Sequence, residues 1–121
     1  MPSGLRVFVL TFESYPMDRL QQLKQFAQDE PDDPFNLYAL ALEFLKTDSN
    51  ESIRLFEKLI KSHSNYLPTY YPYAQLLTER KDIESAERIY QLGISTARSK
   101  GEAKTLGELQ AAYNDWKYEI E

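Results

Sequence analysis

A helical pattern that repeats after about 33–34 residues is the feature of this sequence that most constrains its fold. The shorter shift superimposes small and apolar positions of one stretch on those of another: Leu37 on Tyr70, Leu40 on Tyr73, Ala41 on Ala74, and Phe44 on Leu77. In the stretch that follows, the longer shift does the same: Ser52 on Ala86, Phe56 on Tyr90, and Leu59 on Gly93. Repeats of this length are typical of stacked helix–turn–helix units. The sequence therefore predicts an all-α fold built from helical hairpins.

The change from the shorter to the longer shift marks the turn inside the unit. It indicates a one-residue deletion in the first unit, in the turn near residues 47–50. The pattern predicts one hairpin over residues 34–65 and a second over residues 67–100. The repeat also extends towards the N-terminus. The shorter shift superimposes three apolar residues there on residues of the first unit: Leu20 on Ile53, Leu23 on Phe56, and Phe26 on Leu59. Residues 17–30 are therefore expected to form the second helix of a unit that lacks its first.

Residues 103–120 are expected to form a capping helix, because a stack of hairpins must end in a helix with one polar face. Lys100-Gly101 is typical of a helix end, and the segment from Thr105 to Glu108 fits a capping box at the next helix start. An apolar stripe runs along the expected helix, and Trp116 on it is predicted to be core: Leu106, Leu109, Tyr113, Trp116 and Ile120.

The stretch "NYLPTYYPYAQLL", residues 65–77, contains two prolines that disfavour a helix interior. If Pro68 opened the helix, Pro72 would remove a backbone hydrogen bond and crowd the preceding turn. We favour Thr69 as the cap, because Pro72 then lies in the first turn, where its missing N–H costs nothing. Tyr70 and Tyr73 align with core leucines, so both are predicted to be buried.

These residues resemble the tetratricopeptide repeat family. The resemblance is carried by Ala41 and Ala74 with their apolar neighbours, by Ala86, Tyr90 and Gly93, and by Pro31, which matches the proline that usually ends a unit. "PFNLYALALEFLK" and "YLPTYYPYAQLL" are similar to small bacterial two-repeat members with a C-terminal capping helix. Ser52 and Ser64 depart from the family's usual alanine and proline. The resemblance implies a short right-handed solenoid of helical hairpins, with about six helices over residues 17–121.

The resemblance also implies a function. In this family the first helices of the units line a concave groove in which peptides bind, so we expect a non-enzymatic protein–protein interaction module. The partner would be an apolar or mixed peptide or protein segment, since aromatic side chains are good anchors. By periodicity, seven side chains are predicted to face the groove: Phe35, Tyr38, Leu42, Leu45, Tyr71, Gln75 and Thr78.

Two alternatives to an open groove remain. The N-terminal half-helix, or the apolar segment at residues 5–12, can fill it and cover Phe35 and Leu42. The domain can also self-associate into a homo-oligomer, through the groove or through an uncapped end. Some members of the family clamp an acidic C-terminal carboxylate with several groove cations, but Lys46 is the only cation expected nearby. That specific function is therefore not predicted.

Composition and motifs argue against other classes of function. A net charge of −5 and a pI near 4.9 disfavour nucleic acid or an anionic membrane as partner. The absence of cysteine excludes disulfides and thiolate chemistry and fits a cytoplasmic protein. The sequence has a single histidine, His63, and no cluster of His, Asp and Glu with the spacing of metal ligands. It also has no glycine-rich phosphate-binding loop. We therefore expect no enzyme activity, no cofactor and no metal.

Residues 1–16 are expected to be a poorly ordered tail. "LRVFVLTF", residues 5–12, is apolar but far shorter than the roughly 20 residues of a membrane span. No small-residue cleavage site follows it, so it does not predict a signal peptide. Its alternation would suit a strand, but the sequence provides no strand partner. Alternatively, Met17 is the natural start and the preceding residues are an upstream extension.

A chain that starts at Met17 is expected to keep the helix content and the melting temperature of the full chain, because the tail lacks the helical pattern. Circular dichroism spectra and thermal melts of the two proteins test this. A fall of several degrees on truncation would instead make the tail part of the fold.

Overall fold

In the computed structural model, residues 18–121 are described and form a stack of helices with no strand in that range. The expected tail, residues 1–16, lies outside the described residues. Six α-helices and one 3₁₀ helix follow one another: α2 (Arg19–Asp29), α3 (Pro34–Phe44), α4 (Ser49–Ser62), η1 (Leu67–Thr69), α5 (Tyr70–Glu79), α6 (Ile83–Lys100) and α7 (Ala103–Ile120). The prediction of an all-α helical repeat fold is confirmed.

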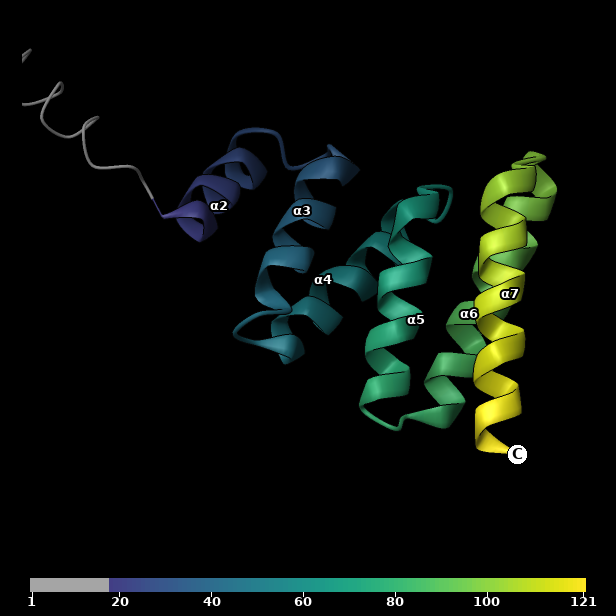
Figure 1. The fold of residues 1–121 in the computed structure, drawn as a ribbon. Helices are drawn as coiled ribbons and strands as arrows, with labels where there is room; N and C mark the ends of the chain where they lie inside the picture. The colour runs from purple at the N-terminus through teal and green to yellow at the C-terminus, as the bar shows by residue number, and fades with distance from the viewer. Residues whose placement is uncertain (1–17) are drawn as a thin grey trace, which may run out of the picture.

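The helices are arranged as neighbouring hairpins (Figure 1). Helix α3 pairs with α4, and α5 pairs with α6, while α2 packs against α3 and α7 packs against α6. In Figure 1, α3, α5 and α7 lie nearer the viewer, and α4 and α6 lie behind them. We call the surface formed by α3, α5 and α7 the first-helix face.

Aspartates define the starts of three helices. The Phe35 N–H donates to Asp33 Oδ1 at 3.0 Å, directly before Pro34 in the first position of α3. Asp48 and Asp82 cap α4 and α6 in the same way, accepting backbone N–H groups at 3.3 Å and 3.2 Å. Each carboxylate satisfies a donor that the helix itself cannot pair. Proline after Asp33 loses nothing, because its missing N–H would be unpaired there anyway.

Gly101 ends α6, as predicted. It has a left-handed φ of 71°, and the Glu102 N–H donates to the Ala97 carbonyl at 3.0 Å, which closes the last turn. The prediction of a capping box that begins at Thr105 is wrong. Helix α7 already begins at Ala103, because the left-handed glycine reverses the chain within two residues and leaves Thr105 inside the helix.

The helix after the two prolines begins where we predicted it, but the predicted cap is wrong. Pro72 lies in the first turn of α5, but Thr69 does not cap it. Thr69 has helical angles within η1, and its buried Oγ1 has no hydrogen-bond partner in residues 18–121. The 3₁₀ turn that contains Pro68 leads directly into α5, and the Tyr70 N–H donates to the Leu67 carbonyl. The chain is therefore already helical before α5 begins.

The one-residue difference between the two units lies in the turn before the aspartate caps. In the second unit Lys81 has a left-handed φ of 61°, and the Asp82 N–H donates to the Leu77 carbonyl at 3.0 Å. In the first unit the Asp48 N–H donates to the Phe44 carbonyl at 2.7 Å. The second unit therefore uses an additional residue in a conformation that costs a side chain about 1–2 kcal/mol.

Small residues bring the two helices of each unit together. Ala74 and Ala86 are fully buried in the second unit, and Ala41 is fully buried in the first. Ser52 stands where the second unit has Ala86, and its Oγ donates to the Ala41 carbonyl at 2.7 Å. This hydrogen bond explains how a buried serine is tolerated there, because the hydroxyl is satisfied within the hairpin.

Aromatic residues join successive elements of the stack. Phe56 of α4 stacks on Tyr73 of α5 with ring centroids 5.1 Å apart. The Tyr73 hydroxyl donates to Glu57, whose carboxylate also lies 2.6 Å from Arg88 Nη2. Burial, together with this hydrogen bond, raises the pKa of Tyr73. Tyr70 and Tyr73 are 1% and 2% exposed, so both are core as predicted.

The end of the stack is closed by α7. Trp116 is buried and lies 5.6 Å from the ring of Tyr90 on α6, which confirms it as core. Helix α6 approaches both of its neighbours closely at Gly93. A Cβ added there would lie 2.7 Å from Tyr70 Cβ on α5 and 3.1 Å from Leu109 Cδ1 on α7.

Gly93→Ala is expected to destabilise the protein by about 1–3 kcal/mol, because the methyl group would overlap Tyr70 near its backbone. Gly107→Ala is the matched control, since a Cβ there meets nothing within 4 Å. The control is expected to stabilise by about 0.5–1 kcal/mol through helix propensity. Urea denaturation of both variants measures the difference, and equal effects would contradict the close packing of α5 and α6.

Lys81→Gly is expected to stabilise the protein by about 0.5–1 kcal/mol, because glycine relieves the left-handed strain at an entropic cost smaller than that strain. Lys81→Ala keeps the strain and serves as the control, with little change expected. Urea denaturation again provides the measurement. If the alanine variant stabilised as much as the glycine variant, the side chain rather than the backbone angle would be responsible.

Candidate functional site

Three of the predicted groove residues meet in a hollow on the first-helix face. Phe35, Tyr38 and Leu42 of α3 line it with Arg19 of α2, and its volume is ≈ 360 Å³. We call it the α2–α3 hollow. Its remaining lining residues are Ala39 and Glu43 of α3 and Lys46 of the turn that follows α3. The apolar side chains share this site because positions 35, 38 and 42 recur on one side of a helix.

Phe35 and Tyr38 differ in burial. Phe35 is 58% exposed although it is a large apolar side chain. Tyr38 is half-buried, and its ring meets that of Tyr66 edge to face at 5.7 Å. Burial raises the pKa of Tyr38. Tyr38 therefore contributes both to the surface of the hollow and to packing against the segment before η1.

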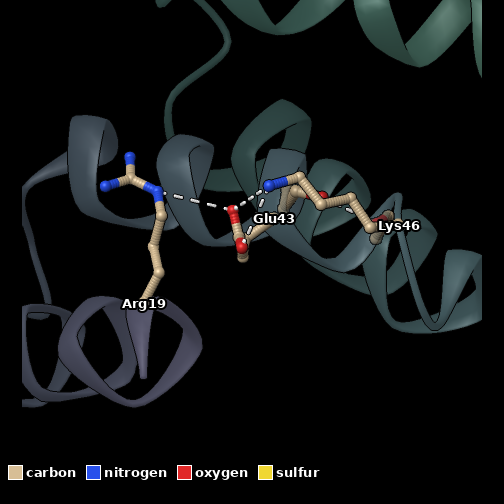
Figure 2. A network of polar contacts seen from close by, with 5 residues as sticks. Arg19, Glu43 and Lys46 are labelled. Carbon is tan, nitrogen blue, oxygen red and sulfur yellow. Dashed lines mark hydrogen bonds and ion pairs between the residues drawn. The ribbon is translucent and has the colours of Figure 1, made fainter. Parts of the chain in front are cut away.

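Ion pairs form the polar edge of this hollow (Figure 2). Glu43 Oε2 lies 3.5 Å from Arg19 Nε and 3.1 Å from Lys46 Nζ. Figure 2 shows the carboxylate between the two cations, Arg19 from α2 and Lys46 from the turn after α3. The expectation that Lys46 is the only cation near the groove is therefore wrong, because the half-helix α2 brings Arg19 to the same edge. Two cations share one carboxylate, so this edge carries a net positive charge.

A second hollow on the first-helix face contains Tyr71. It lies between α5 and α7 and has a volume of ≈ 420 Å³. Tyr71 is 44% exposed, and α7 contributes two carboxylates and two small side chains: Glu108, Asp115, Ala111 and Ala112. We call this the α5–α7 hollow. The expected tyrosine pair is thus divided between two hollows, with Tyr38 in one and Tyr71 in the other.

The remaining predicted groove residues lie elsewhere. Thr78 lines a third hollow, of ≈ 590 Å³, together with Ile83 and the C-terminal end of α7. Leu45, 37% exposed, and Gln75, also exposed, line none of these three hollows. The seven predicted residues therefore do not form one continuous depression.

Self-filling of the groove by the half-helix is not observed at Phe35. Helix α2 places Arg19 at the edge of the α2–α3 hollow, but Phe35 keeps more than half of its surface accessible. The other alternative, filling by the apolar segment at residues 5–12, lies outside the described residues.

The contribution of α7 to this face was not predicted from the sequence, where residues 103–120 were expected only to cap the stack. Glu108, Ala111 and Asp115 follow the spacing of one helix face, and this was the available signal. The spacing alone does not show that the face lies opposite Tyr71. That juxtaposition depends on how α7 packs on α6 and α5.

Other kinds of site have little support in residues 18–121. His63 caps the C-terminal end of α4, and its backbone N–H donates to the Leu59 carbonyl at 2.7 Å. No group of three metal-ligating side chains that could hold an ion occurs in that range. Nor does that range contain a helix with the length and apolar character needed to cross a bilayer. The first-helix face itself provides aromatic and apolar surface with charged edges.

Comparison with known proteins identifies the family. No protein-family model matches the chain, and no curated protein matches it. The solution NMR structure of a tetratricopeptide repeat domain protein from Salinibacter ruber is similar, with 39% identity, a TM-score of 0.68, and coverage of 72% of this chain and 89% of that one. A crystal structure of a tetratricopeptide repeat domain protein from the same organism gives 38% identity, a TM-score of 0.65, and coverage of 70% and 96%. With this identity over most of the solved domain, the chain belongs to the tetratricopeptide repeat family.

Proposed function

We propose that the protein is a non-enzymatic interaction module that binds a peptide or protein segment along its first-helix face. The observation that carries this proposal is the exposure of two aromatic side chains on that face, Phe35 at 58% and Tyr71 at 44%. Aromatic side chains are efficient anchors for a partner, and these two lie in hollows on one face. The repeat fold, which is commonly used for protein interaction, supports the same conclusion.

The arrangement of the tyrosines supports a segment that crosses several helices. Tyr38 and Tyr71 occupy equivalent positions, one repeat apart, on the first helices of successive units. A chain laid across α3, α5 and α7 would meet the α2–α3 hollow first and the α5–α7 hollow next. We assign this role to the domain over residues 17–121, with its half-repeat helix, two repeats and capping helix.

A protein partner also agrees with the composition. The net charge of −5 opposes binding to nucleic acid or to an anionic membrane surface. The absence of cysteine supports a cytoplasmic protein. No catalytic group, cofactor or metal is needed for this function.

Self-association is the second candidate, and one observation favours it. The third hollow lies between the turn that joins α5 to α6 and the C-terminal end of α7, and its lining includes Ile83, 55% exposed, Ile120, 42% exposed, and Trp116. An apolar surface of this kind can pair with a second copy. Sedimentation measured at several protein concentrations distinguishes the candidates, because only self-association makes the mass depend on concentration.

Tyr71→Ala is expected to weaken peptide binding about 5- to 30-fold with little change in melting temperature, since Tyr71 is a surface anchor. Tyr38→Ala is expected to weaken binding similarly and also to lower the stability by about 1–3 kcal/mol, because its ring packs on Tyr66. The probe is a peptide selected on the wild-type chain from a displayed random library, and affinity is measured by fluorescence anisotropy.

Tyr118→Ala is the matched control. Tyr118 is an 83% exposed tyrosine on α7 that lines neither the α2–α3 nor the α5–α7 hollow, so binding and stability should stay unchanged. If Tyr71→Ala and Tyr38→Ala left binding unchanged, the first-helix face would not be the binding site.

A further inference from the structure

The two hollows on the first-helix face differ in charge. At the α2–α3 hollow, Arg19 and Lys46 share the carboxylate of Glu43, which leaves an excess of one positive charge. The α5–α7 hollow is lined by two carboxylates, Glu108 and Asp115, and by no cation. The face is therefore polarised along the direction in which a bound segment would run.

The carboxylates of the α5–α7 hollow are not neutralised within the fold. Neither Glu108 nor Asp115 takes part in an ion pair or a side-chain hydrogen bond with another residue of the 18–121 range. Lys104 precedes Glu108 by one helical turn, but it does not line the hollow. Two exposed carboxylates on one side of a helix repel each other, so a cation placed between them would be bound favourably.

We propose that the partner segment places a basic side chain, arginine in preference to lysine, in the α5–α7 hollow and an apolar side chain in the α2–α3 hollow. This inference rests on the proposed function and names the chemistry of the partner. It predicts a segment with an apolar residue that packs on the apolar side chains of the α2–α3 hollow and a basic residue that meets the carboxylates of the α5–α7 hollow.

Arginine fits the α5–α7 hollow for three reasons. Its flat guanidinium can stack on the exposed ring of Tyr71, which attracts cations. Glu108 and Asp115 lie two turns apart on α7, about 10 Å along its axis, so a cation that enters between them is attracted by both. Ala111 and Ala112 leave room for the side chain because their own side chains are small.

The helical spacing sets the separation of the two side chains in the partner. Neighbouring packed helices have axes about 10 Å apart, and an extended peptide advances about 3.3 Å per residue. The α2–α3 hollow lies beside α3 and the other hollow lies between α5 and α7, so about one and a half to two helix spacings, or about 15–20 Å, separate them. A segment that reaches both should therefore have its apolar and basic residues about four to six positions apart.

Selection of peptides tests the inference first. A displayed library of random peptides, each about 12 residues long so that it spans both hollows, is selected on the full-length wild-type chain. The recovered peptides are expected to combine an aliphatic or aromatic residue with an arginine or lysine at this separation. Recovery of peptides rich in acidic residues, or with no basic residue, would overturn the inference.

Binding of one recovered peptide then tests the site. Its affinity for the Glu108→Gln/Asp115→Asn double variant should be about 3- to 30-fold weaker than for the wild type, as expected for the loss of two exposed charge contacts. The control is Glu30→Gln/Glu84→Gln, which removes the same charge from exposed carboxylates that line neither hollow. The control should bind as the wild type does.

A peptide with citrulline in place of arginine separates charge from shape. It should bind the wild type about 3- to 30-fold more weakly, and its affinity should not fall further with the Glu108→Gln/Asp115→Asn variant. If the arginine peptide lost equal affinity for the Glu108→Gln/Asp115→Asn variant and for the Glu30→Gln/Glu84→Gln control, only the net charge of the protein would matter. That result would overturn the inference.

The outcome also separates this inference from the proposed function. If recovered peptides depend on Tyr38 and Tyr71 but show no preference for a basic residue, the binding face stands and the polarity is wrong. If no peptide binds, or if binding is unaffected at both tyrosines, the proposed function fails, and the inference that rests on it fails too.

Discussion

Contact between Gly93 and Tyr70 is the constraint on which the C-terminal half of the stack depends. A single added carbon at Gly93 would lie 2.7 Å from Tyr70 Cβ and 3.1 Å from Leu109 Cδ1. Three helices, α5, α6 and α7, therefore meet at one point where only a hydrogen atom fits. Packing of this density fixes both the distance between the helices and their rotation about their own axes.

The rotation of α5 determines what the first-helix face presents. Tyr70 and Tyr73 point into the core, and successive residues are about 100° apart around a helix. Tyr71 is consequently turned outward, to the hollow that α7 completes with Glu108 and Asp115. Packing of the core therefore determines part of the proposed binding surface, because the rotation of α5 that buries Tyr70 exposes Tyr71.

The first unit reaches a similar arrangement by other means. Ser52 replaces the small apolar residue of the repeat and is satisfied by the Ala41 carbonyl at 2.7 Å. The link to the second unit uses the Phe56–Tyr73 stack and the bonds that Glu57 makes to Tyr73 and Arg88. Sequence differences between the units are therefore compensated locally, and the stacking of the helices is kept.

The sequence by itself determined the repeat, the helical class and the inward residues, because these follow from spacing along one helix and from caps within a few residues. Tyr70, Tyr73 and Trp116 were predicted as core, and Gly101 as a helix end, on such local grounds. Only the tertiary structure decided that Arg19 joins Lys46 at Glu43, that Tyr38 and Tyr71 line separate hollows, and that α7 places carboxylates beside Tyr71. These contacts join residues from different helices, and the angles at which helices pack depend on the fit of many side chains at once rather than on the period of the sequence.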